Sequence, residues 1–282
     1  MISEYVLTLS CPDRPGVVAA VSGLLADRGC NITESQQFGD RGAGRFFMRV
    51  QFTSALGEDE LRAAFAELAP DLTMDFRLHD LAVRPKVLVM VSKLGHCLND
   101  LLYRVRSGLL DIEIVAVVSN HPDLRPLTQS YGIDYHHLPV TPETKQRQEA
   151  EVLTLVDHYH AELVVLARYM QVLSEDLCAK LSGKVINIHH SFLPSFKGAK
   201  PYHQAHARGV KLIGATAHYV TADLDEGPII EQEVARVNHT HSPEDLAAMG
   251  RDVECLALAR AVRWHAEQRV VLDGHKTIVF PR

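Results

Sequence analysis

The chain has 282 residues, of which 46% are hydrophobic and 23% charged, a composition typical of a soluble globular protein with one large domain or two smaller ones. The formal net charge of −6 argues against a nucleic-acid partner bound through bulk electrostatics. No apolar run approaches the ~20 residues of a membrane-spanning helix, and the N-terminal segment lacks the features of a signal peptide, so no membrane partner is expected.

The five cysteines are scattered along the chain and show no pairing by spacing. This pattern favours reduced thiols and predicts a cytoplasmic protein.

The first eighty residues predict one small domain in which strands and helices alternate. Pro15 and Gly16 open the first helical pattern, and Gly29 ends it. The order of elements, βαββαβ, is the ferredoxin-like pattern. The expected elements are a strand over 4–10, a helix over 16–28, a strand pair over 32–38 and 44–52, a helix around Leu61, Phe65 and Leu68, and a strand over 72–78.

The pattern changes after a short charged stretch at 80–85. Near-continuous apolar strands follow at 87–91, 112–118 and 163–166, with helical patterns between them, which is typical of a parallel sheet with crossover helices. A long helix over 243–267 and a short strand pair are expected at the end. We therefore predict an α/β protein with a ferredoxin-like domain over 1–82 and a Rossmann-like, mostly parallel sheet domain over 83–282.

The most specific chemical signal begins with an apolar run over 184–188, which predicts a buried strand. Asn187 and His189 lie two residues apart, so on a strand their side chains point to the same face. His190 is expected on the opposite face, in a structural role.

A second apolar run, 214–220, leads into the turn Asp225-Glu226-Gly227-Pro228. An amide, an imidazole and a carboxylate are thus expected at strand ends, where open α/β sheets bind their ligands. These groups can activate water and hold a developing oxyanion. Taken alone, Asn187 and His189 would favour a role as strand caps, and for Asp225 a plain turn residue would be an equal alternative.

Residues 187–231 resemble the catalytic half of the folate-dependent formyltransferase and hydrolase superfamily. The matching elements are Asn187, His189, the segment SFLPSFKG at 191–198 and LDEGP at 224–228. The resemblance implies that His189 and Asp225 transfer protons and that Asn187 orients the formyl oxygen.

The same resemblance implies where the folate lies. The loop around Asp225 is expected to contact the pteridine, and Lys197 and Gly198 to contact the substrate; a solvated loop is an equal reading for Lys197. The remaining expected pteridine contacts are Arg168, Tyr169, Met170, Gln171, Val172 and Leu173.

Residues 5–52, with PDRPG at 12–16 and Asn31-Ile32, resemble an ACT domain, a small amino-acid-sensing module. Its candidate effector site comprises Asp13, Pro15, Gly16 and Asn31, with a ligand carboxylate at the helix start. The plain alternative is a helix start with Asp13 as its cap and Pro15 in the first turn. Such domains pair edge to edge, which predicts a homo-oligomer.

The loop after the first strand of the second domain, 92–100, separates the hydrolases of this superfamily from its transferases. It has one glycine and neither glycine-rich nucleotide motif, so it is a poor phosphate nest. Water is then the simplest second substrate. His96 and Cys97 lie in this loop, and the sequence leaves their part in the site open.

The order ACT domain, then formyltransferase-like domain, is similar to that of the superfamily's hydrolase branch. It implies hydrolysis of 10-formyltetrahydrofolate to tetrahydrofolate and formate, which would supply purine synthesis and balance one-carbon pools. The partners expected are this substrate and an amino-acid effector. The alternatives are a formyltransferase with an organic acceptor and a non-catalytic amino-acid and folate sensor.

Histidine clusters at 136–137 and 239–241 invite a metal interpretation. With 16 histidines in the chain such clusters arise by chance, and no His-x-x-x-His with a supporting carboxylate stands out. We expect no metal and no cofactor.

Overall fold

The computed structural model describes residues 2–191 and 201–281. Two compact units divide the chain: Met1–Arg84 with Glu267–Asp273 and Ile278–Arg282, and Pro85–Ala266 with Gly274–Thr277. Among the described residues no helix is long and apolar enough to cross a membrane.

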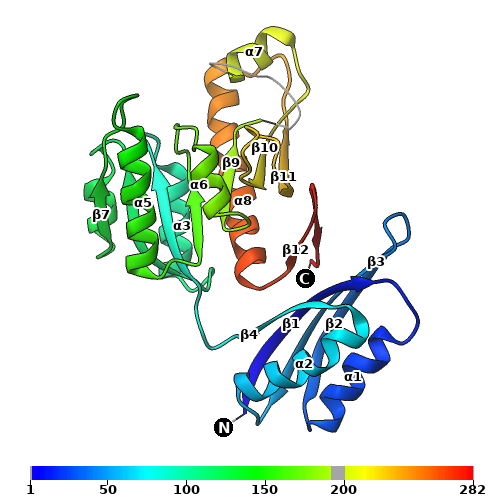
Figure 1. The fold of residues 1–282 in the computed structure, drawn as a ribbon. Helices are drawn as coiled ribbons and strands as arrows, with labels where there is room; N and C mark the ends of the chain where they lie inside the picture. The colour runs from blue at the N-terminus through cyan, green and yellow to red at the C-terminus, as the bar shows by residue number, and fades with distance from the viewer. Residues whose placement is uncertain (1, 192–200, 282) are drawn as a thin grey trace. The chain divides into compact units, whose positions relative to one another are not determined.

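The first unit is built on a four-stranded antiparallel sheet in the order β2-β3-β1-β4, with α1 and α2 on one face (Figure 1). Val21 and Leu25 of α1 and Leu61 and Phe65 of α2 are fully buried in the core beneath the sheet. The predicted ferredoxin-like order is confirmed. The elements are β1 Ser3–Pro12, α1 Val17–Asp27, β2 Asn31–Asp40, β3 Arg45–Ser54, α2 Glu58–Leu72 and β4 Asp75–Asp80.

One boundary in this unit differs from the prediction. The strand expected over 72–78 begins only at Asp75, because α2 continues through Leu72. Thr73, with φ +50°, then turns the chain in the left-handed conformation that ends the helix.

The C-terminal residues belong partly to the first unit, where buried charges hold them. Arg269 is 3.0 Å from Glu34 of β2 and 2.8 Å from Glu267. The nearly inaccessible Arg49 of β3 lies 3.1 Å from the same Glu34. The predicted final strand pair is present as β12 Val270–Asp273 and β13 Lys276–Val279.

The second unit is built on a seven-stranded sheet in the order β11-β10-β9-β8-β5-β6-β7. The five strands from β9 to β7 are parallel to their neighbours, as predicted, and β10 is antiparallel to both β9 and β11. The strands are β5 Lys86–Val91, β6 Glu113–Ser119, β7 Asp134–His137, β8 Leu163–Leu166, β9 Val185–His189, β10 Leu212–Tyr219 and β11 Ile229–Arg236.

Helices cover both faces of this sheet. Val152 of α5 and Leu177 of α6 pack into one core with β5 and β8, whereas α8 packs against β9, β10, β11 and α3. Ser174 caps α6 by accepting a hydrogen bond from the Leu177 amide at 3.2 Å. The helices are α3 His96–Arg106, α4 Arg125–Gln129, α5 Lys145–Tyr159, α6 Glu175–Lys180, α7 Pro201–Arg208 and α8 Pro243–Ala266.

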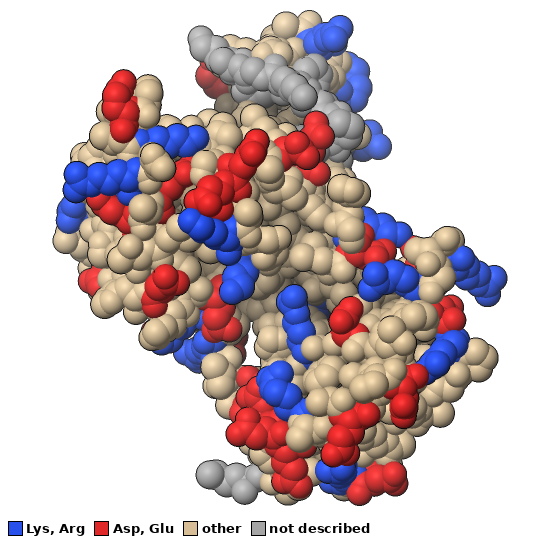
Figure 2. All heavy atoms as spheres, viewed as in Figure 1, with Lys and Arg blue, Asp and Glu red and all other residues tan. Residues whose placement is uncertain are grey.

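The described surface carries charges of both signs. Figure 2 shows acidic and basic side chains intermixed over the drawn face of each unit, in keeping with the small net charge of −6. Such mixing favours solubility over long-range attraction of a polyanion.

Candidate active site

Four polar side chains lie together on the wall of a cavity of about 420 Å³ in the second unit. Asn187 and His189 come from β9, His218 from β10, and Asp225 from the loop that follows β10. Because β9 and β10 are antiparallel neighbours, His218 sits directly opposite Asn187. The three residues predicted as catalytic are therefore close together in space.

These four side chains contact one another in series. Asp225 Oδ2 is 3.2 Å from His189 Nδ1, and Asp225 Oδ1 is 3.7 Å from His218 Nε2. Asn187 Nδ2 lies 3.2 Å from His218 Nε2. A carboxylate thus lies between two imidazoles, one of which also orients an amide.

The loop that carries Asp225 is held in an unusual backbone conformation. Asp225 has φ +58°, a left-handed conformation that costs most non-glycine residues energy but that Asp and Asn adopt more readily. The amide of Tyr219 donates to the carbonyl of Pro228 at 2.9 Å and closes the loop. At Gly227 a Cβ would lie 1.7 Å from the Tyr219 carbonyl oxygen, so only glycine fits there. Such strain is often found at functional sites.

The neighbouring imidazoles control the ionisation of Asp225. The hydrogen bonds from His189 and then His218 hold the pKa of this carboxyl well below its usual range. Asp225 is therefore a carboxylate throughout the neutral pH range.

The hydrogen-bond roles of His218 follow from its backbone partner. His218 Nδ1 lies 2.9 Å from the Tyr219 carbonyl oxygen, which can only accept, so Nδ1 carries the proton. Its Nε2 faces both the Asn187 amide group at 3.2 Å and the Asp225 carboxylate at 3.7 Å. This contact orients the Asn187 amide group on the cavity wall.

His189 presents a second polar atom to the site. Its Nδ1 faces Asp225, but its Nε2 is buried and has no hydrogen-bond partner among the described residues. A buried nitrogen without a partner costs stability unless a ligand satisfies it.

His190 does not lie where the strand pattern predicted. Strand β9 ends at His189, so the alternation of faces stops there. The ring of His190 stacks on that of His189, with centroids 4.9 Å apart, and both rings line the cavity. Burial, with Arg168 and His189 nearby, lowers the pKa of His190 to about 4, so this ring is neutral at physiological pH.

All six residues of the predicted pteridine wall line the cavity. Met170, Val172 and Leu224 expose 58%, 52% and 60% of their surface, which gives the rim an apolar face suited to an aromatic ring. The wall itself is fixed from behind: Gln148 donates to the Tyr169 hydroxyl at 3.1 Å, and burial raises the pKa of Tyr169 to about 12. The predicted contacts Lys197 and Gly198 lie outside the described residues.

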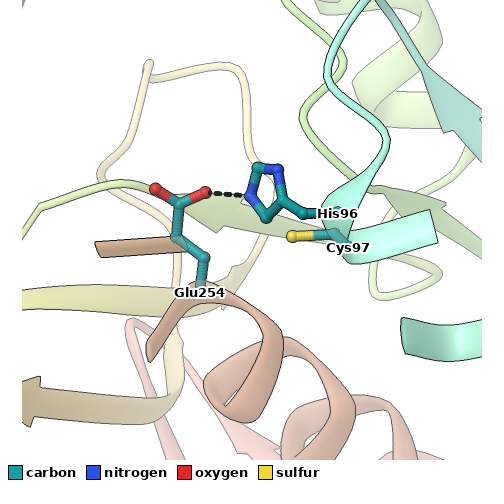
Figure 3. Close-up of side chains that lie close together, drawn as sticks. All are labelled: His96, Cys97 and Glu254. Atoms are coloured by element: carbon teal, nitrogen blue, oxygen red, sulfur yellow. Dashed lines mark hydrogen bonds and ion pairs between the residues drawn. The ribbon is translucent and has the colours of Figure 1, made fainter. Parts of the chain in front are cut away.

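A second cluster, formed by His96, Cys97 and Glu254, brings three metal-binding atom types within 4.8 Å of one another (Figure 3). The Glu254 carboxylate is nevertheless engaged: it lies 2.7 Å from His96 Nε2 and accepts from the Tyr202 hydroxyl at 2.8 Å. Its Oε2 is also 3.5 Å from Arg168 Nε. The groups present fit a closed hydrogen-bonded network better than a cation site.

The thiol of Cys97 is a poor ligand and a poor nucleophile. A hydrogen bond with Cys255 and then burial raise its pKa well above the usual value, so the thiol stays protonated. The sequence left the role of Cys97 open, and its environment favours packing.

The candidate effector residues lie at the start of α1 and of β2, but the expected helix cap is wrong. The N-cap of α1 is Gly16, with φ +94° and no capping side chain, and Pro15 precedes the helix. The Asp13 carboxylate instead packs over β2, where a Cβ on Gly39 would lie 3.1 Å from Asp13 Oδ2. The first amides of α1 therefore lack a side-chain cap, and Asn31 is exposed at the start of β2.

Two residues at or next to the cavity of the second unit, His218 and Glu254, were missed by sequence reasoning. His218 stands in the apolar run over 214–220, and Glu254 falls on the buried stripe of α8 between Gly250 and Ala257. A polar or charged residue at a buried position is itself a signal, because its burial is costly unless it is paired. That signal would have identified both residues.

The chain matches two family models: Formyl transferase over residues 85–262 and ACT domain over residues 5–69. It is 57% identical to the formyltetrahydrofolate deformylase of Corynebacterium sp. (strain P-1) over 98% of each chain.

Two solved structures complete the comparison. The crystal structure of formyltetrahydrofolate deformylase from Burkholderia mallei is 57% identical, with a TM-score of 0.95 over 99% of this chain and 100% of that one. Glycinamide ribonucleotide transformylase 1 from Symbiobacterium toebii is 29% identical, with a TM-score of 0.66 over 70% of this chain and 95% of that one.

Proposed function

The chain belongs to the formyltetrahydrofolate deformylase family, and we propose that Asp225, His189 and Asn187 carry its reaction, the hydrolysis of 10-formyltetrahydrofolate to tetrahydrofolate and formate. The enzyme is a hydrolase that acts on a linear amide C–N bond. The observation that carries the residue assignment is the buried Nε2 of His189, which has no hydrogen-bond partner among the described residues and lies beside an ionised Asp225 and an oriented Asn187.

In the first step a water molecule attacks the formyl carbon. The electron pair of the carbonyl π bond moves to the formyl oxygen, which accepts hydrogen bonds from His189 Nε2–H and the Asn187 amide. Asp225 accepts the proton that the water loses. In the resting site His189 makes Asp225 a weak base, but the growing negative charge on the formyl oxygen offsets the charge of His189 and strengthens Asp225 as a base.

In the second step the tetrahedral intermediate collapses. The electron pair on the oxyanion re-forms the C=O bond as the C–N bond breaks, the pair of the broken bond goes to the folate nitrogen, and that nitrogen takes a proton from Asp225. The carboxylate is restored, and formic acid loses its proton to water.

The folate contacts proposed for this site keep the pteridine on the wall of residues 168–173 and beside the Asp225 loop. The exposed apolar rim of Met170, Val172 and Leu224 supports stacking of the folate rings. Lys197 and Gly198 are proposed to contact the substrate, Lys197 through the charge of its glutamate tail.

Water as the second substrate is supported by the loop after β5. Gly95 is its single glycine, and a Cβ there would meet Leu124 at 2.7 Å, so this glycine serves close packing. His96, the next residue, is committed to Glu254. The loop does not carry the glycine-rich motif that would cradle the phosphate of a phosphate-bearing acceptor.

The wider setting is proposed from the reaction. Released formate would supply purine synthesis and balance one-carbon pools, in the cytoplasm, without a metal or other cofactor. The five free cysteines suit such a reducing compartment. We propose that residues 83–282 form the catalytic domain and that residues 1–82 form the regulatory domain.

Release of formate with no acceptor present tests the proposed function. Purified protein should release formate from 10-formyltetrahydrofolate in stoichiometric amount, without added metal or nucleotide. Formate that appears only when glycinamide ribonucleotide or another amine is added would indicate a formyltransferase. Binding of folate with no turnover at all would indicate a sensor.

The N-terminal domain is proposed to bind an amino acid at the start of α1 and to pair with a second copy of the chain through its sheet edges. The uncapped amides beside Gly16 support a carboxylate at that point, and β2 and β4 are the two edges of the sheet.

We expect calorimetric titration of glycine, methionine or serine to detect binding to the wild type. Gly16→Val should abolish it, because a β-branched residue disfavours φ +94°. Gly23→Val, on the same helix in open space, should not. If the amino acid changes the affinity for folate, the coupling free energy is expected to be about 1–3 kcal/mol. Because such coupling is reciprocal, folate should change the affinity for the amino acid by the same factor. If no amino acid binds at millimolar concentration, the N-terminal domain would serve only in the assembly of the oligomer.

A further inference from the structure

Glu254 is a buried carboxylate one layer behind the cavity wall, with 1% of its side chain exposed. It gathers partners from three other elements: His96 of α3 at 2.7 Å, Tyr202 of α7 at 2.8 Å and Arg168 of the loop after β8 at 3.5 Å. Space for this meeting is provided by Gly250, where a Cβ would lie 2.1 Å from the Tyr202 ring. The Tyr202 ring therefore packs so closely against α8 that only a glycine fits at position 250.

Arg168 connects Glu254 to the cavity. Its backbone is in the left-handed conformation, with φ +64°, and the residue lines the cavity next to the histidines. Its Nε is buried and makes no hydrogen bond among the described residues, so the ion pair with Glu254 is what balances it. A buried charge without its counter-ion is strongly unfavourable.

The ionisation of the network is set by its own contacts. Burial alone would raise the pKa of Glu254, but the hydrogen bond from His96 and the charge of Arg168 hold it below its usual value. Glu254 is therefore an anion that faces the cation Arg168. Behind the cavity wall the two charges nearly cancel.

We propose that Glu254 is a positioning residue of the active site: its carboxylate holds the Arg168 side chain in place and balances its charge, so that His189 can carry the proton that stabilises the oxyanion. This inference rests on the proposed function. Without Glu254 an unbalanced Arg168 would oppose a second positive charge on the His189–His190 stack.

Several titratable or charged groups besides Glu254 surround His189. Those from its own strand and from the elements packed against it are His190, Asp225, His218 and Arg168, and those around Glu254 are His96, Cys97 and Tyr202. Only Glu254 and Asp225 among them are anions. Removal of Glu254 therefore makes the surroundings of His189 more positive.

The test compares the pH profile of kcat in the wild type, in Glu254→Gln and in the control Asp252→Asn. Asp252 is an exposed carboxylate on the same helix, so the control removes a negative charge without opening the network. Glu254→Gln should lower kcat about tenfold at neutral pH and move the alkaline limb about one unit lower, with KM little changed. Asp252→Asn should keep the wild-type profile.

A second comparison, in an Arg168→Met background, separates positioning from general damage. If Glu254 acts through Arg168, adding Glu254→Gln to Arg168→Met should produce no further shift of the alkaline limb. If Glu254→Gln alone does not fold, Arg168→Met provides the measurement: it removes the cation that Glu254 balances, so it should move the alkaline limb upward, and an unchanged limb would overturn the inference.

An unchanged kcat profile in folded Glu254→Gln, or a shift that persists in the Arg168→Met background, would overturn the inference. If the wild type releases no formate, the proposed function itself fails, which is a distinguishable result.

Discussion

Asp225→Asn is expected to lower kcat by about 10²–10⁴-fold and to leave folate binding nearly unchanged. The substitution keeps the size of the side chain and removes the base that accepts the proton from water. Asn also tolerates the left-handed conformation at φ +58°, so the loop should keep its shape. Single-turnover formate release and equilibrium binding of a non-hydrolysable folate measure the two quantities separately.

The control for this substitution is Asp252→Asn, which removes an exposed carboxylate of α8 that does not line the cavity. Its turnover should stay close to the wild-type value. Near-normal turnover of Asp225→Asn would reduce Asp225 to a turn residue and refute its part in proton transfer.

Asn187→Ala is expected to lower kcat by about 10²–10³-fold, the usual cost of losing one donor to an oxyanion. The amide is oriented by His218, whose own orientation is set by the carbonyl of Tyr219. Because the hydrogen bond strengthens as charge develops, the loss should fall on kcat more than on KM. Steady-state kinetics beside Asn99→Ala, an exposed asparagine on α3, provide the measurement. A loss confined to KM would mean that Asn187 only binds the ground state.

Much of the fold follows from apolar periodicity. The strand expected over 163–166 matches β8, and the helix over 243–267 matches α8 within one residue, because both have strong apolar patterns. Strands β7 and β11 were not predicted. Both are edge strands with many polar residues, so their pairing depends on neighbours that no local pattern reveals.

The site was predictable only in part. The spacing of Asn187 and His189 placed both on one face of a strand, and both line the cavity. The contact between His189 and Asp225 depends on the path of the loop after β10 and had no local signal; only the family resemblance suggested it. The stacked position of His190 depends on where β9 ends, which periodicity defines poorly.

The N-terminal helix illustrates a different limit. Asp13, Pro15 and Gly16 have the composition of a helix start, yet the carboxylate of Asp13 packs toward Gly39 on another strand. A tertiary contact thus replaced the local cap. Local propensity describes what a segment can do alone, and packing decides among those choices.

The origin of the second oxygen of formate tests the central claim most directly. A single turnover of 10-formyltetrahydrofolate in H₂¹⁸O, with the Asp225→Asn protein as the blank, should yield formate that carries one solvent oxygen, because water attacks the formyl carbon. Mass spectrometry of the formate measures the label. Unlabelled formate, or recovery of the formyl group on an amine instead of as formate, would contradict direct attack by water at this site.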